Sequence, residues 1–401
     1  MTGIAYEGAA ALDAAFHMPT YARKPVMFVR GEGMRLYDDG GAEYLDFTSG
    51  IGVVNLGHAH PAVAKAVCAQ MGTLVHVSNL FHVEHRAELA ERIVGLFGGG
   101  AKAFFANSGA EANEGAIKLA RRHGKARGGP DCTRIISAER SFHGRTLATL
   151  AATGQPSKQE AFAPLPEGFT HVPLNDLDAL FAEMDETVCA VLLEPIQGEG
   201  GVFPCDPAYL SAVRTLCDER GVLLILDEVQ TGFFRTGPAF AWQSYGVRPD
   251  IMTLAKGMAN GLPIGAVVAV DAVANAFKPG DHGSTFGGGP VVCAAALATI
   301  DAIEEGQLGS RAVAVGEYLR EGLSALAEST GEITDVRGVG QMTGITLARP
   351  IAAEVAGFLL GKGVVVLSVG DSMLRFLPPL VCNNAEIDTL LEILSAAIGS
   401  F

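Results

Sequence analysis

Short apolar runs alternate with amphipathic segments along the middle of the chain. The runs are typical of buried strands, and the segments repeat an apolar residue every three or four positions, as one face of a helix does. This pattern predicts strands at 103–105, 134–137, 188–193, 222–226 and 251–255, and helices at 108–124, 176–184 and 206–221. Repeated strand–helix units with nearly continuous apolar strands predict an α/β fold, with a mostly parallel sheet covered by helices on both faces.

The two ends of the chain follow a different pattern. Short strands and turns between residues 26 and 47 predict a small antiparallel meander, and helices mixed with short strands begin near residue 291. We therefore expect three parts: an N-terminal arm (1–50) that contributes to a small domain, a large domain (51–289) and a C-terminal small α+β domain (290–401).

An aspartate and a lysine follow two of the predicted strands. Asp227 ends the apolar run 222–226, and Lys256 follows the run 251–255. Open α/β sheets bind ligands at the carboxyl ends of their strands, so both side chains are expected at one cleft. The pair suits pyridoxal phosphate, because a lysine can form an imine with its aldehyde and an aspartate can keep its ring nitrogen protonated. A buried ion pair, or a strand-ending aspartate near a solvated lysine, remains an alternative.

A phosphate site is predicted at the start of the helix 108–124. Ser108 and Glu111 form a capping box after the strand 103–105, and the free amides and dipole of such a helix start favour an anion. An ordinary capped helix is the alternative. The chain has no G-x-x-x-x-G-K-[ST] sequence, so a nucleoside triphosphate is not the expected anion.

Further side chains could serve the same cleft. Phe142 could stack on a planar ring, and Arg145 could bind a carboxylate with both its nitrogens. Glu194 and Glu199 follow the strand 188–193 and are expected to face the cleft. Other candidates are two hydroxyls in a glycine-rich loop and an arginine inside a predicted strand: Ser284, Thr285 and Arg375.

Composition narrows the class of protein. The chain is 49% hydrophobic and 18% charged, as in globular proteins, and its formal charge of −15 argues against a nucleic-acid partner. Seven dispersed cysteines indicate reduced thiols, and no cluster of His and Cys has the spacing of a metal site. No secretory signal is visible and the apolar runs are too short to span a bilayer. We therefore expect a cytoplasmic protein with no metal and no membrane partner.

Seven motifs, in order, resemble the class III pyridoxal-phosphate aminotransferases of fold type I, and among these the acetylornithine aminotransferases. They are 107–121 (NSGAEANEGAIKLAR), 142–146 (FHGRT), 194–201 (EPIQGEGG), 226–232 (LDEVQTG), 249–257 (PDIMTLAKG), 282–288 (HGSTFGG) and 374–379 (LRFLPP). The resemblance runs from about Tyr44 to Pro379. Each motif is weak alone, but the ordered set is specific.

The resemblance implies a role for each cofactor-binding residue. Lys256 would form the imine with the cofactor and later move the substrate proton, and Asp227 would pair with the ring nitrogen. Val229 and Phe142 would enclose the ring, and Gln230 would bind its phenolic oxygen. The phosphate would be held by Ser108, Gly109 and Ala110, and by Thr285 of a neighbouring subunit, which implies a homodimer with shared active sites.

The resemblance also implies the substrates. The terminal amine of N2-acetyl-L-ornithine would pass to 2-oxoglutarate, giving N-acetyl-L-glutamate 5-semialdehyde and L-glutamate in arginine biosynthesis. Arg145 and Ser284 would bind the acylated donor, and Arg375 would bind the α-carboxylate of glutamate. Glu199 would mask Arg375 while the terminal amine reacts.

Several alternatives stay open. Succinylornithine, N-succinyl-diaminopimelate or 4-aminobutyrate could be the amine donor, and the segment 50–55 is also similar to 4-aminobutyrate aminotransferases. Aminomutase or decarboxylase chemistry is disfavoured by the presence of Arg145, Arg375 and Glu199 together. A non-catalytic anion- or nucleotide-binding protein is the alternative from another class. The chain departs from the family at Phe233-Phe234, where a glycine usually precedes the arginine, and at Gly289, where an asparagine is usual.

Overall fold

The centre of the fold is a seven-stranded sheet. The computed structural model describes residues 5–401. From one edge to the other, the strands are β4 (Ala101–Ala106), β12 (Gly265–Val270), β11 (Ile251–Leu254), β10 (Leu223–Asp227), β7 (Val188–Leu193), β5 (Arg134–Ala138) and β6 (Phe169–Val172). Strands β10, β11, β7, β5 and β6 pair in parallel, whereas β12 is antiparallel to both β11 and β4. The predicted mostly parallel α/β sheet is confirmed.

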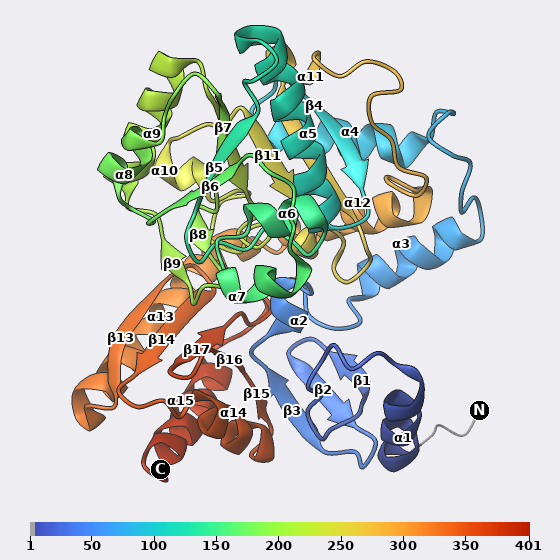
Figure 1. Cartoon of the computed structure of the whole chain (residues 1–401). Helices are drawn as coiled ribbons and strands as arrows, with labels where there is room; N and C mark the ends of the chain where they lie inside the picture. The colour runs from blue at the N-terminus through green and yellow to red at the C-terminus, as the bar shows by residue number, and fades with distance from the viewer. Residues whose placement is uncertain (1–4) are drawn as a thin grey trace.

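The central strands are apolar throughout because both of their faces are covered. Every residue of β7 and β10 is buried. Alternate residues of β10 point to opposite sides, Leu224 and Leu226 into one core and Leu223 and Ile225 into another. Figure 1 shows helices on both sides of the sheet. They are α3 (Pro61–Met71), α4 (Glu84–Leu96), α5 (Gly109–Gly128), α6 (Leu147–Ala152), α8 (Leu177–Ala182), α9 (Pro207–Arg220), α10 (Trp242–Tyr245), α11 (Asp271–Ala274) and α12 (Pro290–Glu305).

Two smaller sheets lie below the large one in Figure 1, where the blue N-terminal and red C-terminal elements meet. The first consists of β1 (Phe28–Glu32), β2 (Arg35–Asp38), β3 (Glu43–Asp46) and β15 (Val364–Val365); the second consists of β13 (Ile333–Val339), β14 (Met342–Leu347), β17 (Met373–Phe376) and β16 (Leu367–Val369). The helices of this region are α1 (Tyr6–Phe16), α13 (Leu308–Thr330), α14 (Ala352–Gly361) and α15 (Asn384–Ile398).

The N-terminal arm packs with the C-terminal elements. Met34 and Phe47 belong to the same core as α13, α14 and α15, and β3 pairs in parallel with β15. By packing, however, α12 belongs to the core of the large sheet, where Cys293 and Ile300 are fully buried. The second core therefore begins in α13, one helix after the boundary expected at residue 290.

Two features of the sheets were not predicted. The apolar run 266–270 forms β12, which is antiparallel to both of its neighbours, β11 and β4. An apolar run does not by itself reveal the direction of its strand. The apolar run 364–367 is divided between β15 and β16, which belong to two different sheets.

The remaining elements are short. They are α2 (Ser49–Gly52), α7 (Pro156–Gln159), η1 (Glu160–Phe162), β8 (Ile196–Gln197), β9 (Phe203–Pro204) and η2 (Lys256–Ala259). Within residues 5–401, no helix has the length and apolarity to cross a membrane, and no group of three His, Cys, Asp or Glu side chains is placed to hold a metal ion.

Candidate active site

A cavity of about 410 Å³ opens at the carboxyl ends of the parallel strands. Its lining includes ten of the thirteen residues that the sequence analysis assigned to the cofactor or substrate, drawn from five separate strand ends; the three others are Ser284, Thr285 and Arg375. The predicted residues that line it are Ser108, Gly109, Ala110, Phe142, Arg145, Glu199, Asp227, Val229, Gln230 and Lys256. Residues separated by up to 148 positions in the chain thus meet at one edge of the sheet.

Asp227 and Lys256 come from neighbouring parallel strands. Asp227 is the last residue of β10 and pairs in register with Thr253 of β11, and Lys256 follows three residues later. Both side chains line the cavity. The expectation that adjacent strand ends bring an acid and an amine to one rim therefore agrees with the geometry.

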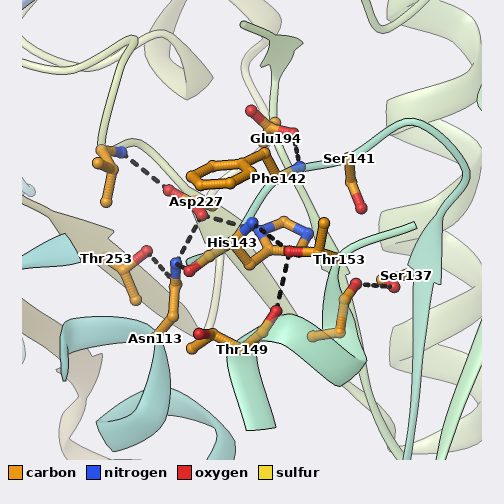
Figure 2. A network of polar contacts seen from close by, with 12 residues as sticks. Asn113, Ser137, Ser141, Phe142, His143, Thr149, Thr153, Glu194, Asp227 and Thr253 are labelled. Carbon is orange, nitrogen blue, oxygen red and sulfur yellow. Dashed lines mark hydrogen bonds and ion pairs between the residues drawn. The ribbon is translucent and has the colours of Figure 1, made fainter. Parts of the chain in front are cut away.

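Three donors surround the Asp227 carboxylate (Figure 2). The Asn113 side-chain amide and Nδ1 of His143 lie 2.7 and 2.8 Å from Oδ2, and the backbone N–H of Val229 donates to Oδ1 at 3.0 Å. Thr253 orients the amide of Asn113 by donating to its oxygen at 2.8 Å. Nε2 of His143 is buried without a partner among residues 5–401. The three contacts fix the orientation of the Asp227 carboxylate.

Lys256 is held in an unusual backbone conformation. Its φ is 43°, a region that side chains other than glycine seldom adopt and that is found at functional sites. Burial is the main cause that lowers the pKa of its amine, and the charge of Arg375 adds to this; Glu199 and Asp227 oppose it. A lowered pKa raises the fraction of neutral amine, which is the nucleophilic form.

The start of α5 provides an anion site. Ser108 is the N-cap and accepts from the N–H of Glu111 at 3.2 Å, which leaves the first amides of a 20-residue helix directed toward the cavity. A Cβ added to Gly109 would lie 2.8 Å from Cγ1 of Val229. Glycine is therefore required here for the helix start to lie against Val229.

Glu194 connects two loops beside the cavity. It follows β7 and accepts from the N–H of Phe142 at 3.0 Å and from the N–H of Gly198 at 3.2 Å. Burial raises the pKa of its carboxyl to about 7, and the charge of Asp227 adds to the rise. Glu194 therefore positions both the loop of Phe142 and the loop that carries Glu199.

Glu199 and Arg375 form an ion pair at the cavity. Nη1 of Arg375 donates to Oε1 of Glu199 at 2.7 Å and lies 3.4 Å from Oε1 of Gln230. Burial disfavours the ionised form of Glu199, but the charges of Arg375 and Lys256 and the hydrogen bonds outweigh it, so the pKa of Glu199 is lowered. Arg375 is 3% exposed in its strand, β17, and Glu199 is its carboxylate partner.

Ser284 and Thr285 do not line this cavity. They border a second cavity of about 760 Å³ on the outside of β4. Oγ of Ser284 accepts from the side-chain amide of Asn107 at 3.1 Å, so Ser284 lies one residue away from the first cavity, whereas Thr285 is exposed. The single chain does not bring Thr285 to Lys256.

Sequence reasoning missed the residues that hold Asp227. The side-chain amide of Asn113 donates to Asp227, 114 positions away, and to the carbonyl of His143, 30 positions away. Nothing in the local sequence connects these residues. His143 lies inside the motif 142–146, between Phe142 and Arg145, which was its one signal.

Comparison with known proteins places the chain in a family. The family model of the class-III aminotransferases matches residues 18–398. The chain is a class-III aminotransferase. It is 49% identical over 388 residues to an acetylornithine aminotransferase of Caldanaerobacter subterraneus, covering 96% of this chain and 98% of the relative. It is 47% identical over 383 residues to the acetylornithine aminotransferase of Methanocaldococcus jannaschii, covering 96% of both chains.

Solved structures of aminotransferases share the whole fold. The ornithine aminotransferase of Toxoplasma gondii superposes with a TM-score of 0.95 at 32% identity, covering 100% of this chain and 96% of that one. The acetylornithine aminotransferase of Elizabethkingia anophelis superposes with a TM-score of 0.89 at 33% identity and covers both chains completely. The predicted fold type I architecture is confirmed.

Class-III aminotransferases use pyridoxal phosphate, and the cavity fits this cofactor. It combines an anion site at the start of α5, apolar faces at Phe142 and Val229, the carboxyl group of Asp227 and a primary amine. These are the groups that a phosphate, a flat ring, a ring nitrogen and an aldehyde require.

The Phe233-Phe234 departure lies in the segment between β10 and α10. Both residues have positive φ, 54° and 66°, a region in which glycine has no steric penalty. Phe233 is 1% exposed and packs edge-on against Phe240, and its carbonyl accepts from the amide of Asn55 at 2.9 Å. Packing of the aromatic ring offsets the backbone strain that a glycine would avoid.

Proposed function

We propose that this aminotransferase moves the terminal amine of N2-acetyl-L-ornithine to 2-oxoglutarate, giving N-acetyl-L-glutamate 5-semialdehyde and L-glutamate in arginine biosynthesis. The observation that carries the proposal is the ion pair of Glu199 and Arg375 at the cavity that contains Lys256. A transaminase must accept two different amine donors in one site. An arginine that pairs with Glu199 in one half-reaction and binds a substrate carboxylate in the other would meet this requirement.

Pyridoxal phosphate, when bound, supplies an aldehyde that takes up the amine and a ring that accepts the electrons released at the substrate carbon. Lys256 would hold the cofactor through its Nζ and would then be free to move a proton at the reacting carbon. Its lowered pKa suits both tasks, because a neutral amine can attack and can act as a base.

Asp227 would hold the proton on the ring nitrogen. His143 and Asn113 fix the orientation of its carboxylate through their contacts with Oδ2. Phe142 and Val229 would enclose the ring, and Gln230 would donate to its phenolic oxygen. Ser108, Gly109 and Ala110 would bind the phosphate through the start of α5.

Glu199 would control whether Arg375 is available to bind a substrate carboxylate. While the pair is closed, Arg375 is not available to the α-carboxylate of glutamate, and Arg145 would bind the carboxylate of an acylated diamino acid. When Glu199 swings away, Arg375 is available to the α-carboxylate of glutamate or 2-oxoglutarate. Arg145 is exposed at the cavity rim, where a substrate can reach it.

We expect Glu199→Gln to change the two half-reactions in opposite directions. Loss of the charge uncovers Arg375, so the rate with glutamate should rise several-fold relative to the rate with acetylornithine, about 1 kcal/mol for one charge pair. Single-turnover absorbance changes of the bound cofactor measure each rate separately. A matched Glu→Gln change at the exposed Glu354 of α14 serves as the control. Equal ratios in the two enzymes would contradict the switch.

We further infer a cytoplasmic homodimer with shared active sites. In support, the segment 71–81 exposes a series of apolar side chains, and Phe286, beside Thr285, is 67% exposed and lies 5.5 Å, centroid to centroid, from the ring of His76. Exposed apolar patches of this kind mark protein interfaces. A second copy on this surface would place Thr285 near the phosphate site of its partner.

Thr285→Val should weaken cofactor binding about tenfold or more, because a hydroxyl that donates to a charged phosphate contributes about 1.5–3 kcal/mol. A mixed dimer of one Lys256→Ala chain and one Thr285→Val chain tests the sharing. If Thr285 acts across the interface, one site of the mixed dimer is intact and binds cofactor with normal affinity. If Thr285 acts within its own chain, no site is intact. Thr389→Val, on the exposed face of α15, is the matched control.

A further inference from the structure

The loop that carries Glu199 is bound by Arg337, a residue of a different sheet. Nε and Nη2 of Arg337, in β13, donate to the carbonyl of Gly201 at 2.9 and 2.6 Å, across 136 positions of the chain. The side chain of Arg337 is 9% exposed. In Figure 1, β13 lies beside β9, where the large sheet meets the smaller ones. The roles proposed above leave this contact without a function.

The guanidinium of Arg337 is fixed by three further contacts. Nη1 donates to Oγ1 of Thr346 at 2.8 Å and pairs with the carboxylate of Asp335. Cζ lies 4.1 Å from the centroid of the Phe203 ring, a distance at which a cation is attracted to the face of an aromatic ring. Arg337 therefore holds both the backbone and a side chain of the segment 201–203, from a position that β13 and β14 determine.

Gly201 lies against the strand that carries Arg375 and against its neighbour. The φ of Gly201 is 114°, and a Cβ added here would lie 2.6 Å from Sδ of Met373, in β17. A Cβ added to Gly344, in β14, would lie 2.7 Å from the carbonyl oxygen of Gly201. Gly344 is the register partner of Arg375. The carbonyl that Arg337 binds is therefore packed on the strand position directly opposite Arg375.

A second anchor holds the other end of this loop. The N–H of Gly198 donates to Glu194, which follows β7, at 3.2 Å, and the N–H of Gly201 donates to the carbonyl of Gly198 at 3.2 Å. Only Glu199 and Gly200 lie between the two anchored residues. A segment of two residues with both ends fixed leaves few positions for the Glu199 carboxylate.

We propose that Arg337 is a positioning residue for the two half-reactions: through Gly201, it holds the Glu199 carboxylate against Arg375. Arg337 is not among the described residues that line the cavity, so it acts without touching substrate or cofactor. The inference rests on the proposed function, since it assumes that Glu199 covers Arg375 in one half-reaction and uncovers it in the other. Loss of the anchor lowers the free-energy cost of uncovering Arg375 and favours the half-reaction with glutamate.

The first test removes the donors of the anchor. In single turnovers of Arg337→Met, we expect the ratio of the glutamate rate to the acetylornithine rate to rise about threefold. Arg337→Lys keeps the charge and one donor, so its ratio should lie between those of Arg337→Met and the wild type, and it decides the outcome if Arg337→Met does not fold. Arg349→Met is the matched control, because Arg349, which follows β14, pairs with Glu332 rather than with this loop. It should leave the ratio at the wild-type value.

A double variant separates positioning from a general structural role. In the Glu199→Gln enzyme no carboxylate remains for Arg337 to position, so adding Arg337→Met should leave the rate ratio of Glu199→Gln unchanged. A purely structural effect would instead change the ratio by the same factor with and without Glu199, and that result would overturn the proposal.

A binding measurement tests the same contact without turnover. Glutarate has the two carboxylates of glutamate and no amine, so calorimetry with the cofactor-loaded enzyme reports its Kd without reaction. Arg337→Met should lower this Kd about threefold, because Arg375 is uncovered more easily. It should leave the Kd of N2-acetyl-L-norvaline unchanged, since this analogue of the donor lacks the terminal amine and would bind Arg145.

The outcomes distinguish the two proposals. An unchanged rate ratio together with an unchanged Kd for glutarate would overturn the role of Arg337 while acetylornithine is still converted. A wild-type enzyme that does not convert acetylornithine would instead overturn the proposed donor. In that case the Kd values for glutarate still decide the role of Arg337, because they depend only on the pair of Glu199 and Arg375.

Discussion

Lys256→Ala is expected to lower the transamination rate by about 10⁴-fold or more and to abolish the visible absorption of the lysine-bound cofactor. The variant loses both the amine that holds the cofactor and the base that moves the substrate proton, and proton transfer by a positioned side chain alone contributes 10²–10⁴-fold. The position is specific, because Lys256 follows β11 at the same edge as Asp227 and both residues line the same cavity. Absorbance spectra and single-turnover rates measure the two losses.

The fold should survive this change. Lys256 contributes an amine to a cavity rather than packing to a core, so the melting temperature of the cofactor-free protein should stay within a few degrees of wild type. Lys65→Ala, on the exposed face of α3, is the control for removing a lysine. If the Lys256→Ala protein kept both the absorption band and the turnover, another amine would have to hold the cofactor.

Asp227→Asn is expected to lower the rate about a thousandfold. The change removes the negative charge opposite the ring nitrogen, and a single preorganised electrostatic contact contributes about 10²–10³ in rate. It also disturbs the site, because the three neighbours of Asp227, Asn113, His143 and the N–H of Val229, all donate hydrogen bonds. An asparagine offers one oxygen to these three donors, and its amide would face at least one of them.

Glu228 supplies the comparison for Asp227. It is the next residue and fully buried, but its oxygens accept from the N–H groups of Trp242 at 2.8 Å and Ala241 at 3.0 Å, away from the cavity. Glu228→Gln should therefore lower the melting temperature and leave the cofactor absorption unchanged. Asp227→Asn should shift the absorption and the rate. If both variants altered stability alone, Asp227 would be a structural residue rather than the partner of the ring nitrogen.

Much of the site could be predicted because parallel strands end at one edge. Apolar runs that finish in a charged residue located Asp227, Lys256 and Glu194, and Ser108 located the start of α5 as its N-cap. The predicted capping box is only half formed, because the carboxylate of Glu111 accepts from Asn107 and not from the N–H of Ser108. Each of these signals is local, because a strand, a helix cap or a turn has a characteristic sequence pattern within a few residues. Five of the seven strands of the large sheet followed from the same runs, whereas β6 and β12 did not.

Contacts between residues that are far apart in the sequence have no local signal of this kind. His143 reaches Asp227 across 84 positions, and Arg337 reaches the carbonyl of Gly201 across 136 positions. The reversed direction of β12 depends on its neighbours β11 and β4 rather than on its own residues. The place of Thr285 depends on a surface that a second chain would cover, so a single sequence cannot fix it.

The most direct test is the visible spectrum of the purified protein with pyridoxal phosphate, recorded before and after addition of N2-acetyl-L-ornithine and then of 2-oxoglutarate. We predict a band from the cofactor bound to Lys256 that disappears with acetylornithine and returns with 2-oxoglutarate. That cycle would demonstrate the cofactor, the reaction and both substrates in one cuvette. A band that responds to glutamate but not to acetylornithine would contradict the proposed donor, and a protein that binds the cofactor with no such band would contradict the role of Lys256.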